Sequence, residues 1–281
     1  MKAWTAAALW RSRRTRRARL TARRCCAWRS MPILYSVESG VARITLNRPK
    51  KRNALSPELI AALSEALAQS ARDGSVRVAL LAGAGQDFCS GADLAALDRT
   101  AEAGVFDHLD AARAIAEVFL AMRRHPRPIV AAVRGRALAG GCGLATACDL
   151  ILASESALFG YPEVKIGFIP AMVMAILRRS VGEKRAFELI TSGEVISAAE
   201  AQAAGMINRV YPDAEFDRSV EAYVAALAAK PASAVGLAKN LLYHMDGMTF
   251  ESALEAGVHA NALARMTEDA KRGIERFVKK A

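Results

Sequence analysis

The 281-residue sequence has few cysteines, and they form no pattern that would hold a metal ion or a disulfide framework. None of the five belongs to a CxxC pair, and two of them are adjacent at Cys25 and Cys26. This argues against a structural zinc module and a secreted disulfide scaffold, so we expect a reducing compartment. The longest stretches without charge, 137–148 and 166–177, have 12 residues each. A membrane-spanning helix needs about 20 apolar residues, so no span is predicted.

Several familiar catalytic motifs are also absent. The sequence has no HExxH, no GxSxG and no GxxxxGKS/T, which argues against a zinc hydrolase, a nucleophile-elbow hydrolase and a P-loop enzyme. None of its four histidines stands beside a cysteine or acidic cluster at metal-ligand spacing. Gly141-Cys142-Gly143 resembles the start of a dinucleotide fingerprint, but Thr146 stands where that pattern needs glycine or alanine. A Rossmann-type site is therefore disfavoured.

Acidic side chains are missing from residues 1–30, which hold ten of the 39 lysines and arginines. The formal net charge of +11 belongs mainly to this leader, because the other 29 basic residues face 28 acidic ones. Apolar residues precede the arginines, which is the wrong order for a secretory signal. Three interpretations stay open: an artefact of start-site choice with translation beginning at Met31, an organellar transit peptide, or an arm that binds nucleic acid. We expect a cytoplasmic location if a bacterial chain starts near Met31, and the mitochondrial matrix if the leader is a transit peptide.

What the sequence does contain is an alternation of strands, glycine-rich loops and helices. Residues 33–38 and 41–47 flank Ser39-Gly40 as a β-hairpin. Two nearly all-apolar strands, 76–82 and 129–133, are each followed by a glycine-rich loop and then by a helix. Because ligands gather at the carboxyl ends of parallel strands, this repeated order predicts an α/β core in which the two loops converge on one site.

Capping residues mark the helix boundaries. Ser56-Pro57-Glu58 predicts a helix start, and that helix should end near Asp73-Gly74. Further helices are expected over 106–124, after the capping box of Ser197 and Glu200, and after the N-caps Thr249 and Thr267. We therefore divide the body into a core over 31–212 and a helical region over 213–281, whose apolar faces should pack on the core or on a neighbouring subunit.

The two glycine-rich loops, 83–91 and 135–143, overlap the small-residue segments 88–94 and 139–143. Small side chains let a ligand approach backbone N–H groups closely, and a helix start adds positive potential. Two such donors on one carbonyl oxygen form an oxyanion hole, worth about 3–4 kcal/mol per donor. The alternative is that the glycines serve only tight turns and close packing, but the repetition of the pattern favours a site.

Four ordered segments resemble the crotonase (enoyl-CoA hydratase/isomerase) superfamily. They are 47–55 (NRPKKRNAL), 88–94 (FCSGADL), 128–149 and 161–170 (YPEVKIGFIP), and the resemblance covers residues 31–281. It implies an α/β fold built as a crotonase-like spiral of ββα units, followed by a C-terminal helical trimerisation region. Family trimers often pair into hexamers, so a homotrimer or a dimer of trimers is implied here.

The resemblance also assigns roles to residues of this chain. It implies an acyl-CoA substrate, with coenzyme A as part of that substrate and no permanently bound cofactor or metal. The thioester oxygen would be held by the N–H groups of Ala92 and Gly140. Further substrate contacts are implied at Lys51, Arg52, Ala54, Asp93, Leu94, Gly141 and, from a neighbouring subunit, Lys280. Neither a membrane nor nucleic acid is an expected partner of a chain of this kind.

One residue departs from the family pattern. Family hydratases usually carry two glutamates, of which the second matches Glu163, whereas the first falls at Gly143. Two carboxylates are needed to hold a water and handle both of its protons during addition across a double bond. A single carboxylate suffices to carry a proton between C2 and C4 of an enolate, and some family isomerases and a few lyases resemble this pattern. An apolar pocket should raise the pKa of Glu163, which suits an acid/base role.

Several points stay open at the level of the sequence. Hydration and double-bond isomerisation of an enoyl-CoA are both compatible with it, because Tyr161 or another polar group could replace the missing carboxylate. Glu163 could instead be a structural charge at a helix start. The chain could also be a non-catalytic or RNA-binding relative that uses the Arg-rich leader. The residues expected to shape the acyl pocket, unless they belong to the core, are Leu97, Phe106, Met172 and Met174.

Overall fold

The computed structural model describes residues 31–100 and 102–279. The leader, and with it the start-site, transit-peptide and RNA-binding interpretations, lies outside the described residues, as does Lys280. No helix within the described part of the chain is both long and apolar enough to cross a membrane.

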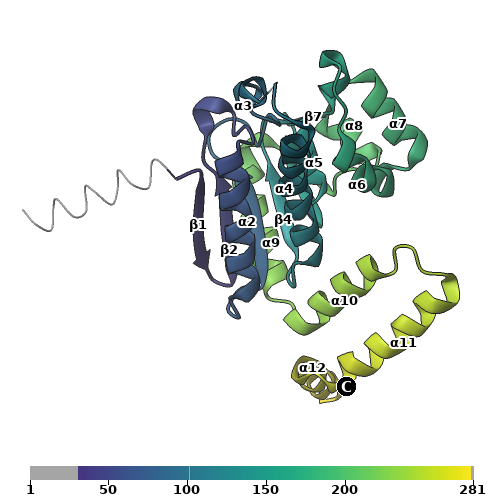
Figure 1. The fold of residues 1–281 in the computed structure, drawn as a ribbon. Coiled ribbons are helices and arrows are strands. Elements are labelled where there is room, and N and C mark those ends of the chain that lie inside the picture. Colours follow the sequence, from purple (N-terminus) through teal and green to yellow (C-terminus); the bar gives the residue numbers. More distant parts are fainter. Residues whose placement is uncertain (1–30, 101, 280–281) are drawn as a thin grey trace, which may run out of the picture.

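A six-stranded sheet forms the centre of the fold (Figure 1). Its strands lie in the order β1 (Ile33–Glu38), β2 (Val41–Leu46), β3 (Val78–Gly83), β4 (Ile129–Val133), β6 (Leu150–Ser154) and β9 (Arg209–Tyr211). β1 and β2 form the predicted antiparallel hairpin, with Ser39 and Gly40 both at positive φ, and the other pairs are parallel. β3 begins two residues later than the sequence predicted.

Helices cover both faces of this sheet, which explains why β3 and β4 are almost wholly apolar. In β3, Ala79 and Leu81 belong to the core beneath α2 (Pro57–Arg72) and α4 (Val105–Arg124). Val78 and Leu80 instead contact α9 (Phe216–Ala228), which lies on the opposite face from α2 in Figure 1. α9 follows Pro212, so the first part of the predicted helical region packs on the sheet.

A second sheet of three short strands lies after β4 in the chain. Its order is β5 (Arg136–Leu138), β7 (Leu158–Gly160) and β8 (Val195–Ser197). β5 falls within 135–143, which the sequence predicted to be a loop throughout. Three residues carry no recognisable period, and the strand exists because residues 136–138 pair in parallel with β7.

The remaining elements before α9 are η1 (Pro49–Lys51), α3 (Leu94–Arg99), α5 (Gly140–Thr146), η2 (Pro162–Ile166), α6 (Ala171–Val181), α7 (Glu183–Ser192), α8 (Ala198–Ala203) and η3 (Asp213–Glu215).

The predicted caps are confirmed where they fall in the described chain. The Ser56 side chain accepts from the Leu59 N–H at the start of α2. Ser197 and Glu200 form the capping box of α8. Thr249 caps α11 (Phe250–Met266), and Thr267 caps α12 (Glu268–Val278).

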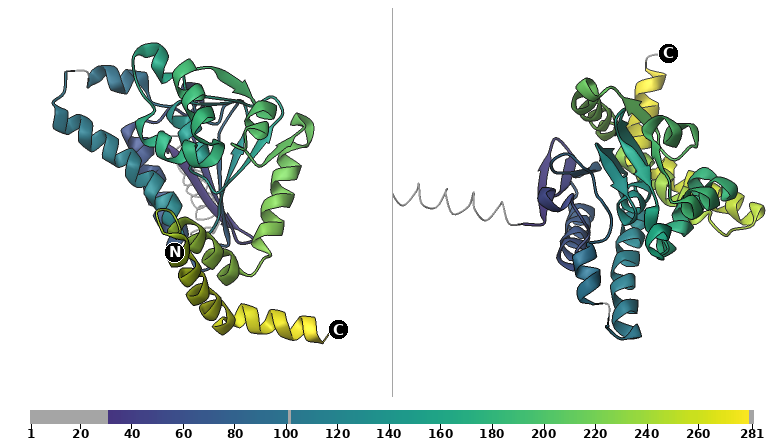
Figure 2. Two further views of the ribbon diagram at one scale, coloured as in Figure 1. Left: turned by 90° about the vertical axis from the view of Figure 1, so that its right-hand side faces the viewer. Right: turned by 90° about the horizontal axis from the view of Figure 1, so that it is seen from above.

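The C-terminal helices α10 (Ala232–His244), α11 and α12 extend away from the rest of the described chain (Figure 1 and the left view of Figure 2). A buried ion pair attaches α10 to the core: Lys239 Nζ lies 2.7 Å from Asp149 Oδ2, just before β6. Tyr243 donates to the other oxygen of Asp149 at 2.6 Å. Large apolar side chains of these helices remain exposed, namely Leu242, Phe250, Leu254, Val258, Leu263, Met266, Ile274, Phe277 and Val278.

Candidate active site

The turn after β2 is held in place by Asn53. This residue is fully buried at a φ of +55°, a conformation that asparagine tolerates better than most residues. Its amide nitrogen donates to the carbonyls of Ala84 and Asp87 at 2.9 and 2.7 Å. Its amide oxygen accepts from the Arg48 N–H at 2.9 Å. These bonds fix the backbone of segment 48–55 against the end of β3.

Segment 88–93 lies between this turn and the start of α5. On one side, the Leu55 N–H donates to the Gly91 carbonyl at 2.8 Å. On the other side, the Leu138 N–H donates to the Cys89 carbonyl at 2.9 Å. The two glycine-rich loops predicted to converge are therefore brought together by backbone hydrogen bonds.

Where the loops meet, the N–H groups of Ala92 and Gly140 come close to each other. A Cβ built on Gly140 would lie 4.0 Å from the Ala92 nitrogen. Neither N–H donates a hydrogen bond to any residue in the described chain. Ala139, just before Gly140, has φ +52° and ψ −132°, a strained conformation for a residue with a side chain. Two unsatisfied donors beside a strained residue are the features of a binding site for a carbonyl oxygen.

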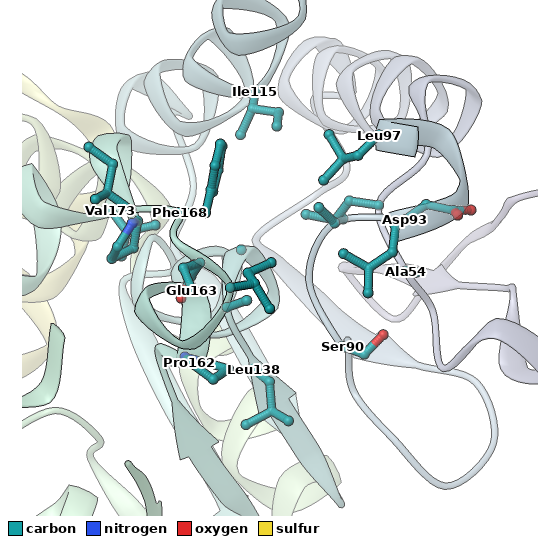
Figure 3. A pocket seen from close by; sticks show the side chains of 18 of the residues that line it. Ala54, Ser90, Asp93, Leu97, Ile115, Leu138, Pro162, Glu163, Phe168 and Val173 are labelled. Carbon is teal, nitrogen blue, oxygen red and sulfur yellow. The ribbon is translucent and has the colours of Figure 1, made fainter. Parts of the chain in front are cut away.

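A cavity of about 600 Å³ opens at this point (Figure 3). Glu163, Phe168 and Val173 lie on one side of it, and Leu97, Ala54 and Asp93 lie on the other. Most of its lining is apolar, with the basic residues Lys51, Arg52 and Lys165 also on the wall. Such a cavity suits a ligand with an apolar part, a few polar atoms to be fixed, and a negatively charged part.

Glu163 is the carboxylate best placed for chemistry in this cavity. It belongs to η2, is only 9% exposed, and its Oε2 is buried without a hydrogen-bond partner in the described chain. Burial raises the pKa of its carboxyl group above the ordinary value. A carboxyl group with a raised pKa in a mostly apolar cavity accepts a proton more readily than an exposed carboxylate does, and can then return it.

Asp93, the other carboxylate on the cavity wall, is bonded to Arg48 and to the first turn of α3. Its Oδ2 lies 2.7 Å from Arg48 Nη2, and its Oδ1 accepts from the Ala96 N–H at the start of α3. The hydrogen bond from Arg48 holds the pKa of this carboxyl group below its usual value. Figure 3 shows its oxygens turned away from Glu163. Asp93 is therefore a structural cap and a poor proton acceptor.

Gly143 lies outside the cavity lining, beneath a side chain of α6. A Cβ built on Gly143 would be 2.3 Å from Val173 Cγ2. Val173 lines the cavity, so hydrocarbon stands between Gly143 and the open space. Tyr161 does not line the cavity; its hydroxyl group is buried 3.3 Å from Thr146 Oγ1. The expectation that Tyr161 could replace a carboxylate there has no support in this arrangement.

The structure gathers most of the predicted site residues on the cavity wall. These are Lys51, Arg52, Ala54, Ala92, Asp93, Leu94, Gly140 and Glu163. Gly141 is not among the lining residues: it is buried, and a Cβ there would lie 2.2 Å from the Cys89 carbonyl oxygen, so only glycine fits at this position. Of the residues expected to shape the acyl pocket, Leu97 and Met172 line the cavity, whereas Phe106 and Met174 do not.

Several lining residues were not singled out from the sequence. Phe168 and Ile169 lie inside the segment 161–170, so the motif itself was a signal for them. Ile115 and Phe119 are four residues apart on α4, a spacing that does not distinguish a cavity wall from a helix core. Val173 gave no signal, because its effect depends on its contact with Gly143, 30 residues earlier.

Comparison with known proteins places this arrangement in context. The family model described as "Enoyl-CoA hydratase/isomerase" matches residues 36–281. The "Putative enoyl-CoA hydratase" of Thermus thermophilus is 41% identical over 248 residues, which is 88% of this chain and 98% of that protein. The 2,3-dehydroadipyl-CoA hydratase of Escherichia coli is 36% identical over 253 residues, which is 88% of this chain and 96% of that protein.

Solved structures agree with these sequence relationships. The crystal structure of an enoyl-CoA hydratase from Mycobacterium smegmatis has a TM-score of 0.85 and 37% identity, covering 89% of this chain and 96% of that one. Human enoyl-CoA hydratase domain-containing protein 3 has a TM-score of 0.84 and 30% identity, covering 89% of this chain and 98% of that one.

Proposed function

Since the chain belongs to the enoyl-CoA hydratase/isomerase family and has its α/β crotonase-type fold, we propose that it stabilises the enolate of an acyl-CoA thioester and moves a proton on and off that enolate with Glu163. The observation that carries the proposal is the position of Glu163. It lies on the wall of the cavity that also holds the free N–H groups of Ala92 and Gly140.

The first role is to hold the thioester oxygen. The N–H groups of Ala92 and Gly140 donate to this oxygen, which gains negative charge when the enolate forms. The hydrogen bonds of the two converging loops fix both donors before the substrate binds, so no reorganisation is needed during the reaction. Loss of one donor of this kind costs about 100-fold in rate or more.

The second role is proton transfer by Glu163, and we propose double-bond isomerisation as the reaction. In a 3-enoyl-CoA, the Glu163 carboxylate takes a proton from C2, and the electron pair of that C–H bond moves into the dienolate. The protonated Glu163 then delivers its proton to C4, and the double bond lies between C2 and C3. The substrate gains and loses no atoms overall, so one carboxyl group is sufficient.

Hydration is the second candidate, because the relatives in Thermus and Escherichia coli carry hydratase names. In this reaction, the hydroxyl group of a water adds to C3 of a 2-enoyl-CoA and a proton adds to C2. The water must be held and deprotonated, so the reaction needs a second polar group beside Glu163. Asp93 is paired with Arg48 and Tyr161 is buried against Thr146, so neither supports this role.

The coenzyme A part of the substrate would lie along the mouth of the cavity. Lys51 and Arg52 are exposed there, and their positive charge complements the phosphates of coenzyme A. Ala54, Leu94 and the cap residue Asp93 complete this edge. We propose no resident cofactor or metal, and Gly141 and Lys280 remain predictions from the resemblance.

We also propose that the chain self-associates through α10–α12, as a trimer or a pair of trimers. Phe250, Leu254, Val258 and Met266 are more than half exposed on the single helix α11. An exposed apolar face of this kind is typical of a surface that is covered by another protein. Light scattering on the purified chain should give a mass that is a multiple of three chains, and a monomer would contradict the proposal.

A product analysis tests the proposed reaction. A 3-enoyl-CoA and a 2-enoyl-CoA are incubated separately with wild type and with Glu163→Gln, and the products are separated by chromatography and weighed by mass spectrometry. The proposal predicts migration of the double bond from C3 to C2 without a change in mass, and its loss in Glu163→Gln. Addition of 18 mass units as the dominant reaction would favour hydration, and equal turnover by both proteins would exclude a catalytic role for Glu163.

A further inference from the structure

We propose that Val173 is a specificity-determining residue: its side chain occupies the place from which a second polar group would hold water, and it thereby commits the site to proton transfer. The inference deepens the proposed function and rests on it. It concerns the contact between α5 and α6, which packs Val173 directly over Gly143.

The geometry leaves no room for a side chain at position 143. A Cβ on Gly143 would lie 2.3 Å from Val173 Cγ2, and 3.4 Å from both Val173 Cβ and Cγ1. Real Cβ atoms do not approach other carbon atoms to 2.3 Å, so any residue larger than glycine requires Val173 to move. Glycine at 143 and valine at 173 are therefore a matched pair.

Val173 cannot easily move aside. A β-branched residue in a helix has one strongly preferred χ1 rotamer, so rotating one methyl group away brings a poorer conformation. The helix itself is held by Leu177, one turn later, which is fully buried in the same core cluster as Val173 and Leu144. The obstruction is thus built into the packing of α6 on α5.

The consequence is a cavity in which water has too few partners. A buried water is held by two to four polar groups, about three on average. Near Val173 the wall is hydrocarbon, and the free N–H groups of Ala92 and Gly140 are occupied by the thioester oxygen in the proposed complex. Glu163 alone remains, and it is also the group that must move the proton. Water addition is therefore slow and proton transfer within the substrate is favoured.

The test measures the ratio of hydration to isomerisation in wild type and three variants: Gly143→Glu, Val173→Thr, and the double variant Gly143→Glu/Val173→Ala. Hydration is followed with a 2-enoyl-CoA and isomerisation with a 3-enoyl-CoA of equal chain length. The double variant removes the obstruction and supplies a carboxylate, so its ratio should rise at least about tenfold. Gly143→Glu alone should melt at a lower temperature than wild type and show no such rise, because Val173 still fills the space.

Val173→Thr provides a second test that does not depend on whether the double variant folds. Threonine has nearly the shape of valine and adds a hydroxyl group that can hold a water, so the ratio should rise at least about threefold. Val118→Ala on α4 is the matched control for valine truncation: Val118 is equally buried but does not line the cavity, and its ratio should equal that of wild type.

The outcomes separate this inference from the proposed function. If Val173→Thr and a folded double variant both keep the wild-type ratio while Glu163-dependent isomerisation persists, the role of Val173 is overturned and the proposed function stands. If wild type itself hydrates the 2-enoyl-CoA faster than it isomerises the 3-enoyl-CoA, Val173 does not exclude water. If Glu163→Gln has full isomerase activity, the proposed function is wrong, and the inference about Val173 is wrong with it.

Discussion

The backbone of Gly91 lies directly against the methyl group of Ala139: a Cβ on Gly91 would be 2.6 Å from the Cβ of Ala139. This contact sets the spacing of the two residues that follow, Ala92 and Gly140, whose N–H groups we propose as the oxyanion hole. The φ of Gly91 is +91°, so a side chain there is disfavoured by the backbone as well as by the contact. The distance between the two proposed donors thus depends on one glycine.

We therefore expect Gly91→Ala to lower kcat by about 100-fold, because one donor moves away from the thioester oxygen. Stopped or continuous assays of 3-enoyl-CoA isomerisation, together with circular dichroism to confirm folding, would measure this. Gly74→Ala is the matched control, since nothing lies within 4 Å of a Cβ at Gly74 and its φ is not positive. Full activity of folded Gly91→Ala would show that the loops do not need this contact.

Relief of the strain at Ala139 should stabilise the protein. Ala139 is held at φ +52° and ψ −132°, a backbone conformation that glycine adopts without strain and that is unfavourable for alanine. We expect Ala139→Gly to raise the free energy of unfolding by about 1 kcal/mol, measured by urea denaturation. The same change at the exposed helical position Ala225 should instead lower it by about 1 kcal/mol. Destabilisation by both substitutions would mean that Ala139 stores no strain.

The sequence was sufficient for those parts of the fold that are specified locally. Ser56-Pro57 and the pair Ser197 and Glu200 carry their helix starts within four residues, and the structure confirms them. Strand β5 was missed, because its three residues become a strand only through pairing with β7. Local pattern predicts an element when the interactions that define it are themselves local.

The site was predictable in its backbone but less so in its side chains. The two glycine-rich loops indicated where Ala92 and Gly140 would meet. The ion pair with Arg48, which makes Asp93 a poor proton acceptor, joins residues 45 positions apart. The contact of Val173 with Gly143 joins residues 30 positions apart. Phe106 was expected in the acyl pocket but is 76% exposed near the start of α4. Apolar character alone cannot say which apolar residues face a cavity.

The raised pKa of Glu163 predicts a pH dependence of both activity and stability. Proton abstraction needs the carboxylate, so kcat/KM should rise with pH and level off above the raised pKa. For stability the sign is opposite. Between the ordinary and the raised pKa, the native state holds the proton and the unfolded state has lost it, so the free energy of unfolding falls as pH rises.

Glu163→Gln checks this sign, because glutamine is neutral at every pH. Relative to wild type, it should show a gain in the free energy of unfolding that is larger at about pH 7 than at about pH 4, measured by urea denaturation at both. Its kcat/KM should show no rise attributable to this group. A gain that shrinks towards neutral pH would mean that the native site favours the ionised form.

The buried pair of Lys239 and Asp149 should dominate the attachment of α10. Lys239 is 8% exposed, so Lys239→Met leaves the Asp149 charge buried without its partner. We expect a loss of about 3–5 kcal/mol in the free energy of unfolding. Lys271 pairs with Glu268 at 2.8 Å on the surface of α12, and Lys271→Met should cost less than about 1 kcal/mol. Equal losses of the two variants in urea denaturation would contradict the claim that the Lys239–Asp149 pair attaches α10 to the core.

The most direct test of the central claim is the loss of the C2 methylene protons of a 3-enoyl-CoA, followed by NMR in deuterated water. A proton that Glu163 removes from C2 is either delivered to C4 or replaced by deuterium, and both outcomes remove the C2 signal. Enolate formation by Glu163 in the hole of Ala92 and Gly140 predicts enzyme-dependent loss of the C2 proton signal. That loss should be at least about 100-fold slower in Glu163→Gln. Loss of the C2 proton at the same rate in wild type and Glu163→Gln, or no loss above the rate in buffer, would contradict the account.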